Sequence, residues 1–287
     1  MPDYNLESLL NRRIELIQFI NLLKKEGILI YKSDIYAYLS YLLKIDYQGV
    51  PLKLKTNILI NANIISELKL LHEGYPLSYI IKSKYFYGHD FYIDKRALIP
   101  REDTSIIINK VLEVNEKLSP VILDLCTGSG CIFISLLLEI KKACAIGIDR
   151  SLDALKVAKI NIERFRVQNR AHIICADVFN IDSLLFSKTF DVVTCNPPYV
   201  GVHDRYDKSI LYEPREALFP DDKKGLNFYK KLLPIVNKLC RKGGFVIFEI
   251  NPLLLKDIMN ILLINKINAK IVNDSGGNPR IVFWKNI

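Results

Sequence analysis

The residues with the most evident chemistry are Asn196-Pro197-Pro198-Tyr199, which follow the apolar run from Phe190 to Cys195. That run predicts a buried strand that ends where the prolines begin. Because proline has a locked φ and no backbone N–H, this segment is stiff and rich in hydrogen-bond acceptors. The Asn196 side-chain oxygen and the Pro197 carbonyl could hold a planar NH2 group, with the ring of Tyr199 as a flat wall beside it. The alternative interpretation is a strand-ending turn with an asparagine cap.

A glycine-containing loop, Cys126-Thr127-Gly128-Ser129-Gly130, follows a predicted strand over residues 121–125 and precedes a predicted helix over 131–140. Its glycines allow a tight turn and a close approach of a ligand to the backbone near a helix N-terminus. The third glycine of a dinucleotide-binding fingerprint is missing, so that fingerprint is not met.

Two further strand ends carry carboxylates. A strand over 145–149 ends in Asp149, about twenty residues after the loop, where an acid can accept hydrogen bonds from ribose hydroxyls. A strand over 172–175 is followed by Asp177, which could accept from an adenine amino group, with Val178 and Phe179 as walls. Each acid alone could be a strand-end cap, but with Asn196 they predict a ligand site at one edge of a sheet.

The expected ligand at that edge is an adenosine derivative without phosphates, since the chain has no P-loop lysine and two carboxylates would repel polyphosphate. S-adenosylmethionine meets this description. Its sulfonium is positive, and the site is expected to have no Lys or Arg nearby that would repel it.

The elements that must position these residues fall into two regions. Apolar residues at helical spacing predict helices from Leu6 to Leu23, from an N-cap at Ser33-Asp34 to Leu43, and from after Thr56 to Leu71. Aromatic runs around Gly88 predict a β-hairpin over 85–93. From Pro120 onward, short apolar strands alternate with helices, which is typical of a parallel sheet.

Composition and charge restrict the function classes. Half of the 287 residues are hydrophobic and 25% are charged, which is typical of a globular protein. No signal peptide or membrane-spanning run is evident, so a cytoplasmic protein is expected. A monomer is also expected. The six cysteines form no CxxC pair and the four histidines are scattered, so we expect reduced thiols and no metal site. The net charge of +9 comes without a basic run, so direct nucleic-acid binding is not expected.

Together these motifs resemble the bacterial peptide chain release factor N5-glutamine methyltransferases, over roughly residues 73–285. The segments that carry the resemblance are Asp124–Gly130, Asp149, Asn196–Tyr199, Glu73–Ile80, Phe86–Phe91, Leu98–Thr104, Tyr212–Leu218, Gly225–Tyr229, Gly243–Phe245 and Phe248–Ile250. The resemblance implies an α/β, Rossmann-like class I methyltransferase fold with a mostly parallel seven-stranded sheet. It also implies a release-factor-docking helical bundle at 1–75, a β-hairpin linker at 76–101 and a methyltransferase domain at 102–287.

The reaction implied by the resemblance is methylation of the side-chain amide nitrogen of the glutamine in the Gly-Gly-Gln motif of release factors, with S-adenosylmethionine as donor. The implied catalytic residues are Asn196, Pro197 and Tyr199, with Pro198 completing the substrate site. The implied cofactor-binding residues are Asp124, Cys126, Thr127, Gly128, Ser129, Gly130, Asp149, Asp177, Val178, Phe179 and Asn196. Candidates for a further substrate or cofactor contact are Arg101, Glu102, Glu213, Pro214 and Arg215.

The chain departs from the family pattern at three places. Asn251-Pro252 stands where the family usually has glycine, Glu102-Asp103 stands where Pro-Glu is common, and Val178 replaces a frequent aromatic. Two other functions stay open at this stage: methylation of an exocyclic amino group, such as adenine N6, in nucleic acid, and a non-catalytic scaffold.

Overall fold

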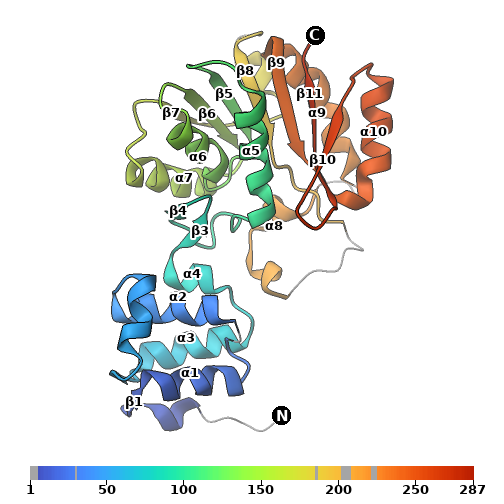
Figure 1. The fold of residues 1–287 in the computed structure, drawn as a ribbon. Helices are drawn as coiled ribbons and strands as arrows, with labels where there is room; N and C mark the ends of the chain where they lie inside the picture. The colour runs from blue at the N-terminus through green and yellow to red at the C-terminus, as the bar shows by residue number, and fades with distance from the viewer. Residues whose placement is uncertain (1–5, 30, 185–186, 202–207, 221–224) are drawn as a thin grey trace. The chain divides into compact units, whose positions relative to one another are not determined.

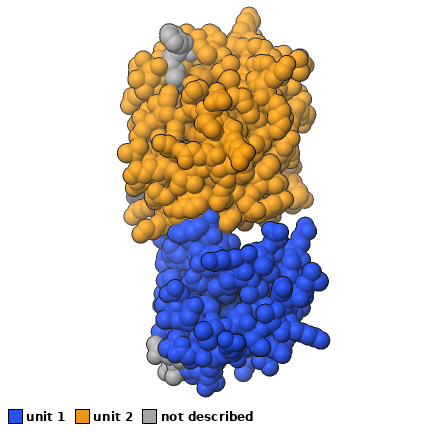
Figure 2. All heavy atoms as spheres, turned by 90° about the vertical axis from the view of Figure 1, so that its left-hand side faces the viewer, with its two compact units in different colours: residues 1–82, 207–212 blue, residues 83–206, 213–287 orange. Residues whose placement is uncertain are grey.

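The computed structural model describes residues 6–29, 31–184, 187–201, 208–220 and 225–287. It divides into two compact units, one of residues 1–82 with 207–212 and one of residues 83–206 with 213–287 (Figure 2). Because the division falls between residues 82 and 83, the predicted linker at 76–101 is shared by both units. The predicted domain boundaries and the docking role of the first unit stay predictions.

The first unit is mainly helical (Figure 1). Its helices are α1 (Leu16–Lys25), α2 (Lys32–Leu43), α3 (Ala62–His72) and α4 (Leu77–Ile81), with 3-10 turns at Leu6–Leu9, Tyr47–Lys53 and Lys208–Tyr212. A short antiparallel pair joins β1 (Arg13–Glu15) to β2 (Asn57–Leu59). Apolar residues from all three longer helices form its core, including Phe19, Tyr38 and Leu68.

Two predicted helix boundaries in this unit are wrong for a common reason. The first helix starts at Leu16 instead of Leu6, and the third starts at Ala62 instead of just after Thr56. The residues between these positions pair as strands β1 and β2, a tertiary contact that helical periodicity does not reveal. The side chain of Asn61 then caps the third helix, because its oxygen accepts from the Ile64 N–H at 3.0 Å. The second helix begins at Lys32, one residue before the predicted cap.

The second unit contains a seven-stranded sheet, as predicted (Figure 1). Its strands are β5 (Val121–Leu125), β6 (Cys144–Asp149), β7 (Ala171–Cys175), β8 (Phe190–Cys195), β9 (Cys240–Glu249), β10 (Lys270–Asn273) and β11 (Pro279–Lys285). They lie in the order β10-β11-β9-β8-β5-β6-β7. Strands β7, β6, β5, β8 and β9 run parallel, and β11 and β10 add antiparallel strands at one edge. The sheet is therefore mostly parallel.

Helices cover both faces of this sheet (Figure 1). One face packs against α5 (Ser105–Val114), α6 (Cys131–Glu139) and α7 (Leu152–Arg164). The other face packs against α9 (Leu226–Leu239) and α10 (Leu255–Ile264). Strand β8 is buried along its whole length, which fits its mostly apolar sequence, although Asp191 and Thr194 lie within it. The carboxyl ends of the parallel strands therefore meet at one edge of the sheet.

The predicted hairpin lies at the start of this unit. Strand β3 (Lys84–Phe86) pairs with β4 (His89–Phe91) through a turn at Tyr87 and Gly88, both with positive φ. Buried Asn161 on α7 joins the segment after the hairpin to the glycine loop. Its oxygen accepts from the Tyr92 N–H at 2.7 Å, and its amide donates to the Ser129 carbonyl at 2.9 Å. The hairpin and the loop are thus held by one side chain.

Candidate active site

The glycine loop is shaped by a buried carboxyl beneath it. Asp124 near the end of β5 is fully buried and accepts from the hydroxyls of Thr127 at 2.6 Å and Thr194 at 2.7 Å. Burial raises the pKa of Asp124 to about 7, although the hydrogen bonds from Thr127 and Thr194 act in the opposite direction. Asp124 does not line the cavity above it. It therefore supports the loop from below, and its predicted contact with a cofactor stays a prediction.

Gly130 ends the loop in a left-handed backbone conformation that residues with a Cβ rarely adopt. Its φ is +80°, and a Cβ there would lie 2.9 Å from side-chain carbons of both Phe133 and Ile134. The glycine thus lets the loop turn directly into α6 and pack closely on it. Within the loop, the Thr127 N–H donates to the Ile148 carbonyl at 3.0 Å and the Gly130 N–H donates to the Thr127 carbonyl at 2.8 Å, which fixes the shape of the turn.

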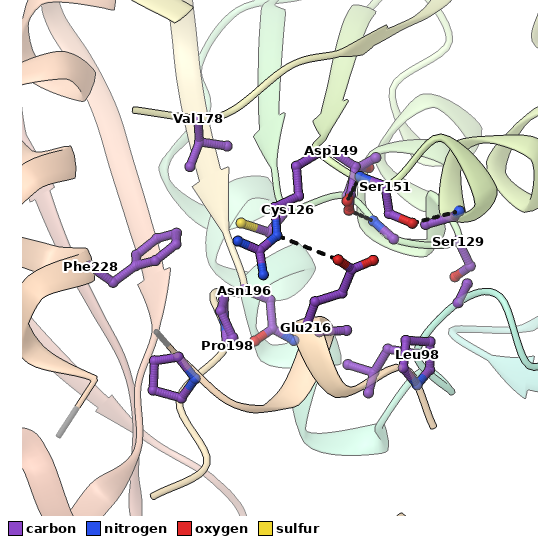
Figure 3. Close-up of a pocket in the computed structure, with 18 of the residues that line it drawn as sticks. Leu98, Cys126, Ser129, Asp149, Ser151, Val178, Asn196, Pro198, Glu216 and Phe228 are labelled. Carbon is purple, nitrogen blue, oxygen red and sulfur yellow. Dashed lines mark hydrogen bonds and ion pairs between the residues drawn. The ribbon is translucent and has the colours of Figure 1, made fainter. Parts of the chain in front are cut away.

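Asp149 at the end of β6 ties the glycine loop to the next helix (Figure 3). Its two oxygens accept from the backbone N–H groups of Gly128 at 2.8 Å and Ser151 at 2.9 Å. Burial raises the pKa of Asp149, although both backbone hydrogen bonds act in the opposite direction. Each carboxylate oxygen keeps acceptor capacity for a further donor, so the placement is compatible with binding of ribose hydroxyls.

A cavity of about 360 Å³ opens at this edge of the sheet. Ten predicted site residues line it: Cys126, Thr127, Gly128, Ser129, Asp149, Asp177, Val178, Phe179, Asn196 and Pro198. Asp124, Gly130, Pro197 and Tyr199 do not. Among the further candidates, Arg101 and Pro214 line the cavity, whereas Glu102, Glu213 and Arg215 do not. The strand ends thus bring most of the predicted residues together.

One wall of the cavity is apolar and suits a flat ring. Val178 is buried, and the ring of Phe179 meets that of Phe228 on α9 edge-on, with 5.1 Å between centroids. Val178 and Phe228 both lie at this side of the cavity (Figure 3). Asp177 is exposed and accepts from the Phe179 N–H at 3.0 Å, so it also fixes the turn after β7.

The expectation that no Lys or Arg lies near the site is wrong. Arg96, Arg101, Arg150 and Lys231 all line the cavity. Each arginine faces a carboxylate, from Asp94, Glu213 and Glu216 respectively, and the Lys231 ammonium lies 5.3 Å from the Phe179 ring centroid. The three carboxylates offset the charges of the three arginines, so a positive sulfonium is still compatible with the cavity. Arg101 and Arg150 pair with carboxylates from distant segments, which sequence order hides, whereas Arg96 pairs with Asp94 only two residues away.

Asn196 lies at the end of β8 and faces the cavity with Pro198 (Figure 3). Its amide nitrogen lies 3.4 Å from the hydroxyl oxygen of Thr104 and donates to it. Among the described residues none donates to the Asn196 side-chain oxygen, which leaves that oxygen able to accept from a ligand. This is the acceptor that the sequence predicts for a planar NH2 group.

Tyr199 is anchored below the cavity. Its hydroxyl donates to the carboxylate of buried Glu249 at 2.7 Å, and its backbone carbonyl accepts from the Asn251 amide at 3.1 Å. Burial and the nearby Glu249 charge raise the pKa of Tyr199 well above its ordinary value. Asn251, which replaces the usual glycine, thus fixes the asparagine-proline segment from behind. The predicted packing of the Tyr199 ring on a substrate amide stays a prediction.

Glu213 holds the segment before α5 in place. It is buried, and its carboxylate accepts from the Arg101 guanidinium and from the Ile99 N–H, the latter at 3.0 Å. A buried carboxylate with a cationic and a backbone donor is well compensated. Glu213 therefore orients the cavity wall, and Arg101 presents the side chain that borders the cavity.

Three residues that the sequence reasoning did not single out contribute to this region: Thr104, Phe228 and Glu249. Phe228 forms the apolar wall, Thr104 contacts Asn196, and Glu249 contacts Tyr199. All three stand in segments that carry the family resemblance, which was the available signal. None has an isolated chemical signature, because their roles depend on contacts between distant segments.

Comparison with known proteins agrees with this geometry. A family model described as "Methyltransferase domain" matches residues 92–274. The catalytic domain of hMettl16 in complex with MAT2A 3′UTR hairpin 1 has the same fold, with a TM-score of 0.57 at 16% identity, over 70% of this chain and 76% of that one. With a mostly parallel seven-stranded sheet and a cavity at its carboxyl edge, the chain is a class I S-adenosylmethionine-dependent methyltransferase.

Relatives define the family more narrowly. The release factor glutamine methyltransferase of Mycoplasma mycoides is 36% identical, over 93% of this chain and 95% of the relative. That of Flavobacterium psychrophilum is 34% identical, over 74% of this chain and 76% of the relative. The chain belongs to the release factor glutamine methyltransferase family.

Proposed function

We propose that this protein transfers a methyl group from S-adenosylmethionine to the side-chain amide nitrogen of the glutamine in the Gly-Gly-Gln motif of peptide chain release factors. The observation that carries the proposal is Asn196, whose side-chain oxygen is left for a ligand at the cavity while its NH2 group faces Thr104. The family of the chain supports the substrate class.

The residues at the end of β8 address the central difficulty of this reaction. An amide nitrogen is a poor nucleophile because its lone pair is delocalised into the carbonyl. The Asn196 oxygen and the Pro197 carbonyl would each accept one N–H of the substrate amide and aim the lone pair at the donor. Holding reactants in this way can lower the barrier by several kcal/mol. Both acceptors bind more strongly as positive charge develops on the nitrogen, which accelerates the step.

The residues around the cavity fit the methyl donor. Asp149 would accept from the ribose hydroxyls, Asp177 from the adenine amino group, and Val178 with Phe228 would border the base. S-adenosylmethionine supplies an electrophilic methyl group: the new C–N bond forms as the C–S bond breaks, and the proton on the nitrogen leaves to water. The chain therefore needs no general base for this transfer.

Substitution of Asn196 by Ala tests the proposal. We expect kcat for release factor methylation to fall by about 100- to 1,000-fold, as when a transition-state hydrogen-bonding group is removed. The Kd for S-adenosylmethionine, measured by calorimetry, should hardly change. The assay uses labelled S-adenosylmethionine and purified release factor, with the modified residue mapped by mass spectrometry. Exposed Asn169 gives the matched control, Asn169→Ala. Wild-type turnover in Asn196→Ala would contradict the assigned role.

The same assay separates the two alternative functions. Adenine N6 presents the same planar NH2 group as a glutamine amide, so duplex DNA and ribosomal RNA are tested as substrates beside the release factor. Methylation of nucleic acid with none of release factor would favour the first alternative. Failure to bind S-adenosylmethionine would favour a non-catalytic scaffold.

We further propose that the protein acts as a monomer in the cytoplasm, where release factors are found, and without direct nucleic-acid contact. No described helix combines the length and the apolar character needed to cross a membrane. Sedimentation of the purified protein, alone and with release factor, tests the monomeric state.

A further inference from the structure

Thr104 lies beside Asn196 at the border of the cavity. It ends the 3-10 turn Glu102–Thr104, is almost completely buried, and borders the cavity. Its hydroxyl oxygen is the acceptor for the Asn196 amide nitrogen, at 3.4 Å. Catalytic hydrogen bonds are often long before the substrate binds and tighten when it does. Thr104 thus touches the group that is to hold the substrate.

Glu249, at the end of β9, lies next to both Thr104 and Tyr199. Its carboxylate is fully buried, and one oxygen accepts from the Tyr199 hydroxyl at 2.7 Å. The other oxygen is buried and has no hydrogen-bond partner among the described residues. Burial raises the pKa of Glu249, whereas the neighbouring hydroxyls of Tyr199 and then of Thr104 lower it.

A buried carboxyl in this position needs an explanation beyond packing, because an incompletely satisfied buried acid is costly. The positive charge of Arg280 lowers the pKa of Glu249 and so favours its ionised form, whereas the negative charge of Asp103 raises that pKa. Arg280 itself pairs with Asp103 at 2.9 Å and Asp274 at 3.0 Å. The site therefore keeps an acid where a neutral side chain would cost less.

The three groups set the direction of a hydrogen-bond chain. In its ionised form, which the hydroxyls of Tyr199 and Thr104 favour, Glu249 can only accept, so the Thr104 hydroxyl directs its proton toward Glu249. The Thr104 oxygen is then an acceptor and draws the NH2 group of Asn196, which turns the Asn196 oxygen toward the cavity. The reverse orientation would present two N–H donors to a substrate amide that itself needs acceptors.

We propose that Thr104 and Glu249 are positioning residues that fix the amide orientation of Asn196, through the chain Asn196 NH2 to Thr104 hydroxyl to Glu249 carboxylate. The inference rests on the proposed function, since it concerns the same substrate amide. Neither residue contacts the reacting atoms; both act through Asn196.

The test compares Thr104→Val with Thr104→Ser. Valine keeps the shape of threonine but lacks the hydroxyl, and serine keeps the hydroxyl. We expect kcat for release factor methylation to fall by about 10- to 100-fold in Thr104→Val, the range for a misplaced catalytic group. Thr104→Ser should stay within about threefold of the wild type, well below a tenfold positioning effect. The KM for release factor and the Kd for S-adenosylmethionine should be unchanged in both, and the Tm of each variant checks its fold.

A second arm uses Glu249→Gln and the double variant with Thr104→Val. If both residues act in series through Asn196, the double variant loses no more kcat than the worse single variant. Equal kcat in Thr104→Val and Thr104→Ser would overturn the inference, as would a loss confined to KM or multiplied losses in the double variant. Failure of the proposed function is distinguishable, because the wild type would then yield no methylated glutamine.

Discussion

Replacement of Asp124 by Asn should remove the pH dependence that this one carboxyl gives to the free energy of unfolding. The ordinary pKa of an Asp is 3.8, and burial beneath the glycine loop raises that of Asp124 to about 7. Between these values the folded protein keeps a proton that the unfolded chain has lost. The stabilising contribution is therefore complete below pH 3.8 and is lost as the pH rises through about 7.

The magnitude follows from the difference between the two pKa values, which corresponds to about 4 kcal/mol over the whole window. Between pH 5 and pH 8, the wild type should lose about 3 kcal/mol of this contribution to its free energy of unfolding. An Asn at position 124 does not titrate. Relative to the wild type, Asp124→Asn should therefore gain about 3 kcal/mol in free energy of unfolding between these two pH values, whatever the constant effect on the hydrogen bonds of Thr127 and Thr194.

The assay is urea unfolding of both proteins at pH 5, 6, 7 and 8, with the change in their stability difference as the measured quantity. The control is Asp153→Asn, because Asp153 is exposed and paired with Lys156 at 2.7 Å, an arrangement that lowers its pKa. Its pH effect should be small and of opposite sign. A stability difference between wild type and Asp124→Asn that stays constant from pH 5 to pH 8 would refute the reasoning.

Two further predictions concern the cofactor loop. Asp149→Ala removes the acceptor of the Gly128 and Ser151 N–H groups, so the Kd for S-adenosylmethionine should rise by about 10- to 100-fold in calorimetry; an unchanged Kd would contradict the ribose role. Gly130→Ala should lower the free energy of unfolding by more than about 1 kcal/mol, because it adds steric overlap to a positive φ. Gly277→Ala, with φ +82° and open space around it, isolates the effect of φ, and equal losses in urea unfolding would show that overlap at Gly130 costs nothing.

Much of the fold could be predicted from sequence because β5, β6, β7 and β8 are short, apolar and bounded by polar turns. The apolar sequence of each strand predicts that the strand is buried, and the parallel arrangement of the strands places their carboxyl ends together. The first helix could not be bounded correctly, because residues 13–15 owe their strand to pairing with residues 57–59. Periodicity within one segment does not contain that partner.

The site shows the same division. Asn196 and Asp149 could be identified from the sequence, because each is a polar residue at the end of an apolar strand. Thr104 and Glu249 do not, because their roles come from a contact between segments that lie 92 and 50 residues from their partners Asn196 and Tyr199. Arg101 was a candidate from the sequence, whereas Arg96 and Arg150, which pair with Asp94 and Glu216, were not. The net charge at the cavity depends on the carboxylate partners of these arginines as well as on the arginines themselves.

The position of β8 in the sheet has a consequence for how the protein is made. β8 lies between β5 and β9, and Asp124 reaches Thr194 across 70 residues of chain. During synthesis the glycine loop and β6 leave the ribosome well before β8, and β8 well before β9. Until β9 emerges, β8 lacks one of its two neighbouring strands, and Tyr199 lacks its partner Glu249. Assembly of the site therefore depends on slow contacts between distant segments, and a nascent chain that already contains every cofactor-loop residue would still be inactive.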